Sequence, residues 1–132
     1  MVPYRQTILV VDDSSVVRRV TRGMLEQAGY RVVAAKDGYA ALNASLEFPG
    51  PIHLLLTDVV MPGMNGRELA REVLIRRPSI QVLYMSGVVT AGDLDPGKPF
   101  LPKPYSQLDL IRKVEELLPP PSRSGDPATL HT

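Results

Sequence analysis

The sequence predicts an α/β protein built on a doubly wound, five-stranded parallel sheet with the strand order 2-1-3-4-5. Short apolar runs of strand length alternate along the chain with longer stretches whose apolar residues recur at helical spacing. Strands that alternate with helices pair in parallel, and the helices then cover both faces of the sheet. At 132 residues, the chain has the length of one ordinary domain.

The first part of the chain supplies three strands and two helices. Runs of apolar and β-branched residues predict strands at residues 7–11, 31–35 and 52–57. A helix is expected at residues 14–28, where Gly29 ends it. Its apolar residues recur at helical spacing, at Val16 or Val17, Val20, Met24 and Ala28. Asp37 is the expected N-cap of a second helix, which runs to about Leu46.

The second part of the chain supplies two more strands and two more helices. Asn65 and Glu68 form the expected capping pair of a helix that ends at about Arg76, before Pro78. Strands are expected at residues 81–85 and 100–101. Ser106 is expected to cap the last helix. The apolar face of that helix would hold Leu108, Ile111, Val114, Leu117 and Leu118.

Residues 88–99, between the last two strands, depart from the alternation of strands and helices. They include two glycines and two prolines in twelve residues, a composition that does not sustain a helix. We therefore expect the fourth helix of the pattern to be absent or reduced to a turn; a harmless deletion in a surface loop is the alternative. The domain is expected to cover residues 1–118, and the proline-rich residues 119–132 to form a disordered tail or the remnant of a linker.

Composition excludes several classes of protein. Fifteen Lys and Arg against fourteen Asp and Glu give a net charge of +1, which offers no global attraction to nucleic acid or an anionic membrane. Without cysteine, the chain has no disulfide framework and no cysteine-ligated metal site. No apolar run approaches the ~18 residues of a membrane span, and the first residues lack the apolar stretch of a signal peptide. A soluble, cytoplasmic protein is therefore expected.

Polar and charged side chains follow the strands at one edge of the predicted sheet. Asp12 and Asp13 follow the first strand and Asp58 follows the third, and in this strand order ligands bind between those two strands. Crowded carboxylates repel one another unless a cation joins them, and oxygen-only ligands suit Mg²⁺. Ser86 follows the fourth strand and Lys103 the fifth. The edge thus holds the parts of a phosphoryl-transfer site: a metal, a carboxylate nucleophile and donors to the phosphoryl oxygens.

Each of these residues also has an ordinary structural interpretation. Asp12 and Asp13 can cap the first helix, and Asp58 can be a turn residue. Ser86 precedes a glycine in a common turn dipeptide, and Lys103 can be a solvated loop lysine. Capping and turn formation do not explain why acids follow the first and third strands, a hydroxyl the fourth and a lysine the fifth, so the joint functional interpretation is favoured.

Four stretches of the sequence resemble the receiver domains of two-component response regulators. They are residues 8–13, 55–66, 85–87 and 103–105, and the second is the most specific. The resemblance extends over residues 7–118, nearly the whole predicted domain. Residues 54–70 and 83–87 are most similar to receivers fused to hybrid sensor histidine kinases.

The resemblance implies a phosphoacceptor and a metal site. Asp58 would take a phosphoryl group from a phosphohistidine on a histidine kinase or a histidine phosphotransfer domain. Asp13, Asp58 and the backbone carbonyl of Val60 would bind Mg²⁺. Asp12 would act mainly through a water molecule on the metal.

The resemblance also implies how the phosphoryl group is held. Ser86 would hydrogen-bond to it and move toward it on activation, Lys103 would pair with one of its oxygens, and the Lys103–Pro104 peptide bond would be cis. Phe100 stands where the family keeps an aromatic switch residue, although packing of a short strand explains Phe100 equally well. The apolar Val60 stands where receivers influence access of water to the phosphoryl group, so slow self-dephosphorylation is expected.

The sequence therefore predicts a phosphoacceptor receiver of a two-component phosphorelay. It would not be an enzyme beyond its self-catalysed phosphorylation on Asp58, and it can belong to a hybrid histidine kinase. Its phosphodonor would dock beside Asp58, on the first helix and the loop after the fifth strand. A monomer is favoured, because a missing fourth helix puts the usual dimer face in doubt.

Two other classes of function compete with the phosphoacceptor interpretation. The first is an unphosphorylated interaction module, against which the intact set of acids, hydroxyl and lysine argues. The second is a flavin carrier or a phosphatase on the same fold. The sequence after the first strand, Asp-Asp-Ser-Ser-Val-Val, is not a phosphate-cradling flavin loop, and Val60 stands where an Asp-dependent phosphatase would need a second Asp.

Overall fold

The computed structural model describes residues 5–87 and 98–119, and it confirms the predicted sheet. Five strands, all paired in parallel, have the order β2-β1-β3-β4-β5. The strands are β1 (Thr7–Val11), β2 (Arg31–Ala35), β3 (Leu54–Asp58), β4 (Gln81–Ser86) and β5 (Phe100–Pro102). The helices are α1 (Ser15–Gln27), α2 (Gly38–Glu47), α3 (Gly66–Arg76) and α4 (Gln107–Leu117).

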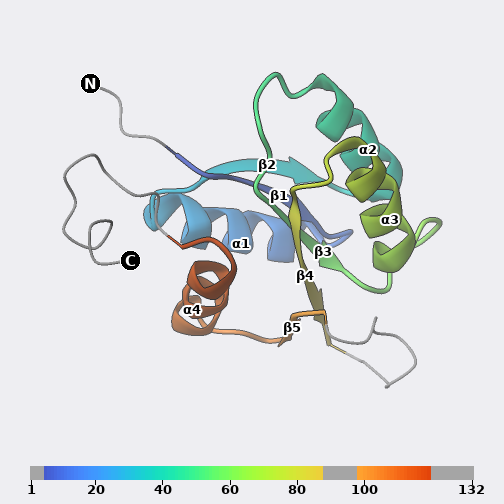
Figure 1. The fold of residues 1–132 in the computed structure, drawn as a ribbon. Helices are drawn as coiled ribbons and strands as arrows, with labels where there is room; N and C mark the ends of the chain where they lie inside the picture. Colours follow the sequence, from blue (N-terminus) through green and yellow to red (C-terminus); the bar gives the residue numbers. More distant parts are fainter. Residues whose placement is uncertain (1–4, 88–97, 120–132) are drawn as a thin grey trace, which may run out of the picture.

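The sheet is the middle of three layers (Figure 1). Helices α1 and α4 cover one face, and α2 and α3 cover the other. Successive side chains of a strand point to opposite faces, so each central strand contributes to two cores. In β1, Ile8 and Val10 pack in the core beneath α1 and α4, whereas Leu9 and Val11 pack in the core beneath α2 and α3. Strands β1 and β3 are buried along their whole length, which explains their unbroken apolar sequences.

The strands at the centre of the sheet end on the residues predicted to do chemistry. β3 begins at Leu54, not at Ile52 as predicted, and it extends to Asp58. β4 likewise extends to Ser86. Asp58 pairs with Met85 in the register of the sheet, and Ser86 pairs with Pro102. The strand ladder therefore fixes the backbone of Asp58 and of Ser86, which the sequence analysis had assigned to the residues just after the strands.

The predicted apolar face of α1 is wrong in part, although Met24 packs against the core beneath α1 and α4 as predicted. The buried residues of the helix are Thr21 and Leu25, whereas Val16 and Val20 are 64% and 51% exposed. Ala28, which the prediction also placed in the apolar stripe, is exposed. Neighbouring helical residues differ by about 100° around the axis, and the buried Thr21 and Leu25 each lie one residue after a predicted position. A search for apolar residues at helical spacing does not select Thr21, because its hydroxyl is polar.

The predicted inward face of α4 is wrong at one position. Leu110 and Val114 are buried as an i, i+4 pair, and Leu108 is 58% exposed. Residues 108 and 110 lie about 200° apart on a helix, so both cannot face the sheet. The predicted caps hold, since Asp37, Asn65 and Ser106 each accept a backbone N–H bond at the start of their helices.

The segment in which a reduced fourth helix was predicted falls largely outside the described residues, at 88–97. The described residues between β4 and β5, namely 87, 98 and 99, are not helical, and the described chain contains four helices. The predicted tail at 119–132 also lies outside the described residues, apart from Pro119. Within residues 5–87 and 98–119, no helix is both long enough and apolar enough to cross a membrane.

Candidate functional site

Three carboxylates meet where β1 and β3 end. Asp12 and Asp13 follow β1, Asp58 ends β3, and these two strands are neighbours in register. One oxygen from each carboxylate lies within 4.8 Å of the others. Asp12 and Asp58 are buried, whereas Asp13 is exposed to solvent. The structure thus brings together the acids that the sequence analysis selected, with Asp13 on the side open to a ligand.

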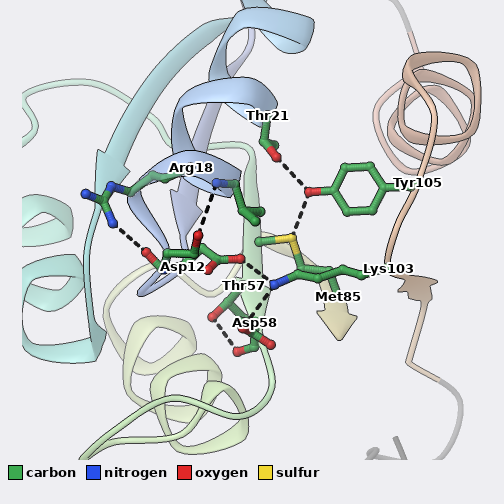
Figure 2. A network of polar contacts seen from close by, with 10 residues as sticks. Asp12, Arg18, Thr21, Thr57, Asp58, Met85, Lys103 and Tyr105 are labelled. Carbon is green, nitrogen blue, oxygen red and sulfur yellow. Dashed lines mark hydrogen bonds and ion pairs between the residues drawn. The ribbon is translucent and has the colours of Figure 1, made fainter. Parts of the chain in front are cut away.

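The Lys103 ammonium lies between two of these acids (Figure 2). Its Nζ is 2.6 Å from an Asp12 oxygen and 3.1 Å from an Asp58 oxygen. The backbone N–H of Lys103 donates to the Ser86 carbonyl at 2.9 Å, which ties the segment after β5 to the end of β4. The Lys103–Pro104 peptide bond is cis, as the sequence comparison implied. Lys103 is the cation that lets two buried carboxylates coexist.

The loop between β1 and α1 holds Asp12 in place. One Asp12 carboxylate oxygen accepts the backbone N–H of Ser14 at 2.9 Å, and Arg18 donates to the Asp12 carbonyl at 2.7 Å. Ser14 is the N-cap of α1, because its hydroxyl accepts the N–H of Val17. Capping of α1 is therefore not the reason for the two aspartates, since a serine does it.

Burial and the Lys103 charge shift the pKa of Asp58 in opposite directions. Burial raises the pKa of Asp58 and Asp12 adds to the rise, while Lys103 and the Val60 backbone N–H lower it; the pKa remains raised. Burial lowers the pKa of Lys103, but Asp12 and Asp58 outweigh that effect and leave the pKa raised. Without a metal, the protein thus disfavours the charged carboxylate of Asp58 and favours the charged ammonium of Lys103.

The raised pKa of Asp58 predicts a pH dependence of stability in the metal-free protein. Above the ordinary value of 3.8, native Asp58 keeps a proton that the unfolded chain has lost, so this residue's contribution to stability falls as pH rises. Asp58→Asn removes the titration. Urea unfolding in EDTA at several pH values measures the free energy of unfolding of both proteins. The value for the variant should rise relative to that of the wild type as pH increases. A difference that stays constant with pH would contradict the raised pKa.

The other predicted site residues occupy the same end of the sheet with different exposure. Ser86 is buried at the end of β4. The Val60 side chain is 60% exposed, two residues beyond Asp58. Phe100 is half-buried, pairs with Tyr84 across β4 and β5, and packs against the core beneath α2 and α3. Packing accounts for Phe100 in this arrangement, and its switch role stays a prediction.

Gly66, for which no role was predicted, lies against the backbone of Asp58. A Cβ atom at Gly66 would lie 2.2 Å from the Asp58 carbonyl oxygen and 3.1 Å from the Cα of Val59. The N–H of Gly66 donates to the Val59 carbonyl at 2.8 Å. A glycine that follows a capping asparagine is a sequence feature that, in hindsight, points to such a close backbone approach.

The contact between Thr21 and Tyr105 was not predicted from the sequence, although Tyr105 belongs to the stretch 103–105 that carries the family resemblance. Their hydroxyl oxygens are 2.7 Å apart, and the Tyr105 hydroxyl also donates to the Met85 sulfur at 3.2 Å (Figure 2). Burial raises the pKa of Tyr105, so the phenol keeps its proton. The contact joins α1 to the segment just beyond Lys103.

A doubly wound sheet with three acids, a hydroxyl and a lysine at the carboxyl ends of its strands defines a receiver domain. A model of the response regulator receiver domain family matches residues 8–115. The chain belongs to this family, whose members are signalling domains of two-component systems. The resemblance noted in the sequence is confirmed.

Relatives of the chain include a free-standing receiver and a receiver within a kinase. The response regulator receiver protein CpdR of Brucella abortus (strain 2308) is 34% identical over 116 residues, which cover 84% of this chain and 95% of CpdR. The sensor kinase CckA of the same organism is 37% identical over 117 residues, which cover 85% of this chain and 12% of the kinase. The chain therefore spans the length of the first relative and a small part of the second.

Solved structures agree with these relatives. The receiver domain from the hybrid histidine kinase CckA has a TM-score of 0.75 and 36% identity, with 85% of this chain and 98% of that chain covered. The chemotaxis protein CheY4 of Vibrio cholerae has a TM-score of 0.79 and 25% identity, with 87% and 100% covered. The fold and the hybrid-kinase resemblance predicted from sequence are both supported.

Proposed function

We propose that Asp58 is the phosphoacceptor of this receiver domain and takes its phosphoryl group from a phosphohistidine in a Mg²⁺-dependent reaction. The observation that carries the proposal is the setting of Asp58 at the end of β3. Its buried carboxylate is 3.1 Å from the Lys103 ammonium and lies within 4.8 Å of oxygens of Asp12 and Asp13. A buried acid among further acids and one cation suits a group that receives a phosphoryl anion in the company of a metal.

In the proposed step, a carboxylate oxygen of Asp58 attacks the phosphorus atom of the phosphohistidine. A P–O bond forms while the P–N bond breaks, and the electron pair of the P–N bond remains on the imidazole nitrogen of the donor. Lys103 moves its pairing from the Asp58 carboxylate to a phosphoryl oxygen, and the Ser86 hydroxyl donates to another. Both donors act on charge that grows as the phosphoryl group arrives.

Mg²⁺, when bound, neutralises the charge of the acids and of the phosphoryl oxygens. Asp13, Asp58 and the Val60 carbonyl would hold it, and Asp12 would act through a water molecule. The donor set fits this ion, because all donors are oxygen atoms and the three carboxylates converge within 4.8 Å. The exposed Asp13 leaves the site open to an ion that keeps part of its water shell.

We infer that the phosphodonor docks in the groove between α1 and the segment after β5. The groove has a volume of about 440 Å³ and includes Val16, Val20 and Met24 on one side and Pro104 on the other. Lys103 also lines it, so a partner in the groove lies beside Asp58. The exposed valines of α1 serve no core, and an apolar partner surface explains them. The partner is a helix of a histidine kinase or of a histidine phosphotransfer domain.

Intact-protein mass spectrometry tests the phosphoacceptor. After incubation with acetyl phosphate and Mg²⁺, the wild type should gain one phosphoryl group, whereas Asp58→Asn should gain none. EDTA should prevent the gain, and Asp109→Asn, a matched change at the start of α4, should leave it intact. A labelled Asp58→Asn protein would overturn the proposal. So would an unlabelled wild type under conditions that label a control receiver.

Val60 predicts a slow loss of the phosphoryl group. An exposed apolar side chain two residues from Asp58 offers no donor or acceptor to orient an attacking water. The isolated phosphoprotein should keep its label for minutes or longer in the absence of a phosphatase, and Val60→Asn should shorten that time. The decay of the phosphorylated mass peak measures both. A wild-type half-life of seconds would contradict the prediction.

A further inference from the structure

The hydroxyl of Tyr105 joins three elements around the site. The Thr21 hydroxyl oxygen on α1 lies 2.7 Å from it, and the sulfur of Met85 on β4 accepts a hydrogen bond from it at an O–S distance of 3.2 Å. Thr21 and Met85 are 1% and 0% exposed, so bulk water does not compete for either contact. Figure 2 shows the phenol pointing away from α4 toward these two partners, next to the Lys103 side chain. Two buried partners fix the position of a single phenol oxygen.

The two ends of the segment 103–105 are fastened to consecutive residues of β4. At one end, the Lys103 N–H donates to the carbonyl of Ser86 at 2.9 Å. At the other, the Tyr105 hydroxyl donates to the side chain of Met85. Pro104 lies between them, and its ring restricts the backbone φ angle. With both ends attached to the same strand, the Cα of Lys103 has little freedom to move relative to Asp58, which pairs with Met85.

We propose that Tyr105 is a positioning residue for Lys103. Its hydroxyl, held by Thr21 and Met85, keeps the segment 103–105 close to the end of β4. In that position the Lys103 ammonium reaches both Asp12 and Asp58. The inference rests on the proposed function, in which Lys103 pairs with the incoming phosphoryl group. A long, flexible lysine side chain needs a fixed backbone to deliver its charge to one place.

The aromatic ring of Tyr105 also packs against the core beneath α1 and α4, so the test must separate the ring from the hydroxyl. Tyr105→Phe keeps the ring and removes only the oxygen. Tyr30→Phe is the matched control, because Tyr30 packs against the same core but follows α1, beside β2. Thr21→Val removes the second hydroxyl and keeps the branched shape of the side chain.

The experiment measures three properties of the full chain: the rate of phosphorylation by acetyl phosphate, the affinity for Mg²⁺, and amide hydrogen exchange at Lys103. Tyr105→Phe should slow phosphorylation roughly tenfold, since small displacements of a catalytic group have effects of this size. Its Mg²⁺ affinity should not fall, because the acids are untouched, and its Lys103 amide should exchange faster. Thr21→Val should act in the same direction, and the double variant should be little worse than Tyr105→Phe.

Each outcome decides the inference. A wild-type rate or unchanged Lys103 exchange in Tyr105→Phe would overturn it. Loss of rate together with loss of Mg²⁺ affinity, or an equal effect of Tyr30→Phe, would show a general disturbance and overturn it as well. If the wild type takes no phosphoryl group, the proposed function fails. The Lys103 amide then still shows whether the hydroxyl anchors the segment.

Discussion

Replacing Gly66 with alanine is expected to lower the free energy of unfolding by about 3 kcal/mol, the upper range for overpacking of a rigid site. The new methyl group would lie 2.2 Å from the carbonyl oxygen of Asp58. The atom that the methyl group meets is backbone, and the methyl group itself is rigidly attached to the backbone of α3. No flexible side chain can yield, so α3 must move away from the end of β3. Phosphorylation should fall below detection, because the displaced strand end is the one that presents the Asp58 carboxylate.

Gly23→Ala is the matched control for this prediction. Gly23 lies inside α1, and a Cβ atom built there meets nothing within 4 Å. Alanine is the better helix former, so this variant should be more stable than the wild type by up to about 1 kcal/mol. Urea unfolding and acetyl phosphate labelling of both variants test the pair. A Gly66→Ala protein with wild-type stability and labelling would show that the contact with Asp58 does not constrain the site.

The fold could be predicted because its pattern is local. Each buried strand is a short apolar run, and each helix after α1 begins at a capping side chain that the sequence shows directly. The acids of the site could be predicted from the strand order, since a parallel sheet gathers the carboxyl ends of its strands at one edge. Asp12, Asp13, Asp58 and Lys103 needed only the strand order to be brought together.

The features that escaped prediction depend on packing between distant segments. Thr21 and Tyr105 are 84 residues apart in the chain, and neither residue by itself indicates the other as its partner. The buried threonine also misled the assignment of the inward face of α1, because a hydroxyl with a distant partner does not count as apolar. Gly66 is visible in the sequence, but the atom that excludes a side chain there belongs to Asp58.

Replacing Lys103 with methionine is expected to have the second large effect. Methionine has a similar length and no charge, so Asp12 and Asp58 lose the cation that lies 2.6 and 3.1 Å away. Removal of one partner from a buried ion pair costs about 3–5 kcal/mol. We expect the free energy of unfolding without Mg²⁺ at pH 7 to fall by about 3 kcal/mol, and phosphorylation to slow about 100-fold or more.

The pH and metal dependence of this loss identifies its cause. Unpaired buried acids bind protons more tightly in the native state than in the unfolded chain. The loss in free energy of unfolding caused by Lys103→Met should therefore become smaller as pH falls. Mg²⁺ should restore more stability to the variant than to the wild type, because no ammonium then competes for the carboxylates.

Lys113→Met supplies the comparison for Lys103→Met. Lys113 pairs with Glu116 at 3.7 Å on the surface, where 33% and 64% of the two side chains are exposed. Loss of such a pair should cost about 0.5 kcal/mol or less and leave labelling unchanged. If Lys103→Met and Lys113→Met lower the free energy of unfolding in urea by the same amount, with and without Mg²⁺, the ammonium of Lys103 does not balance the charge of the acids. The charge arrangement on which the proposed site depends would then be wrong.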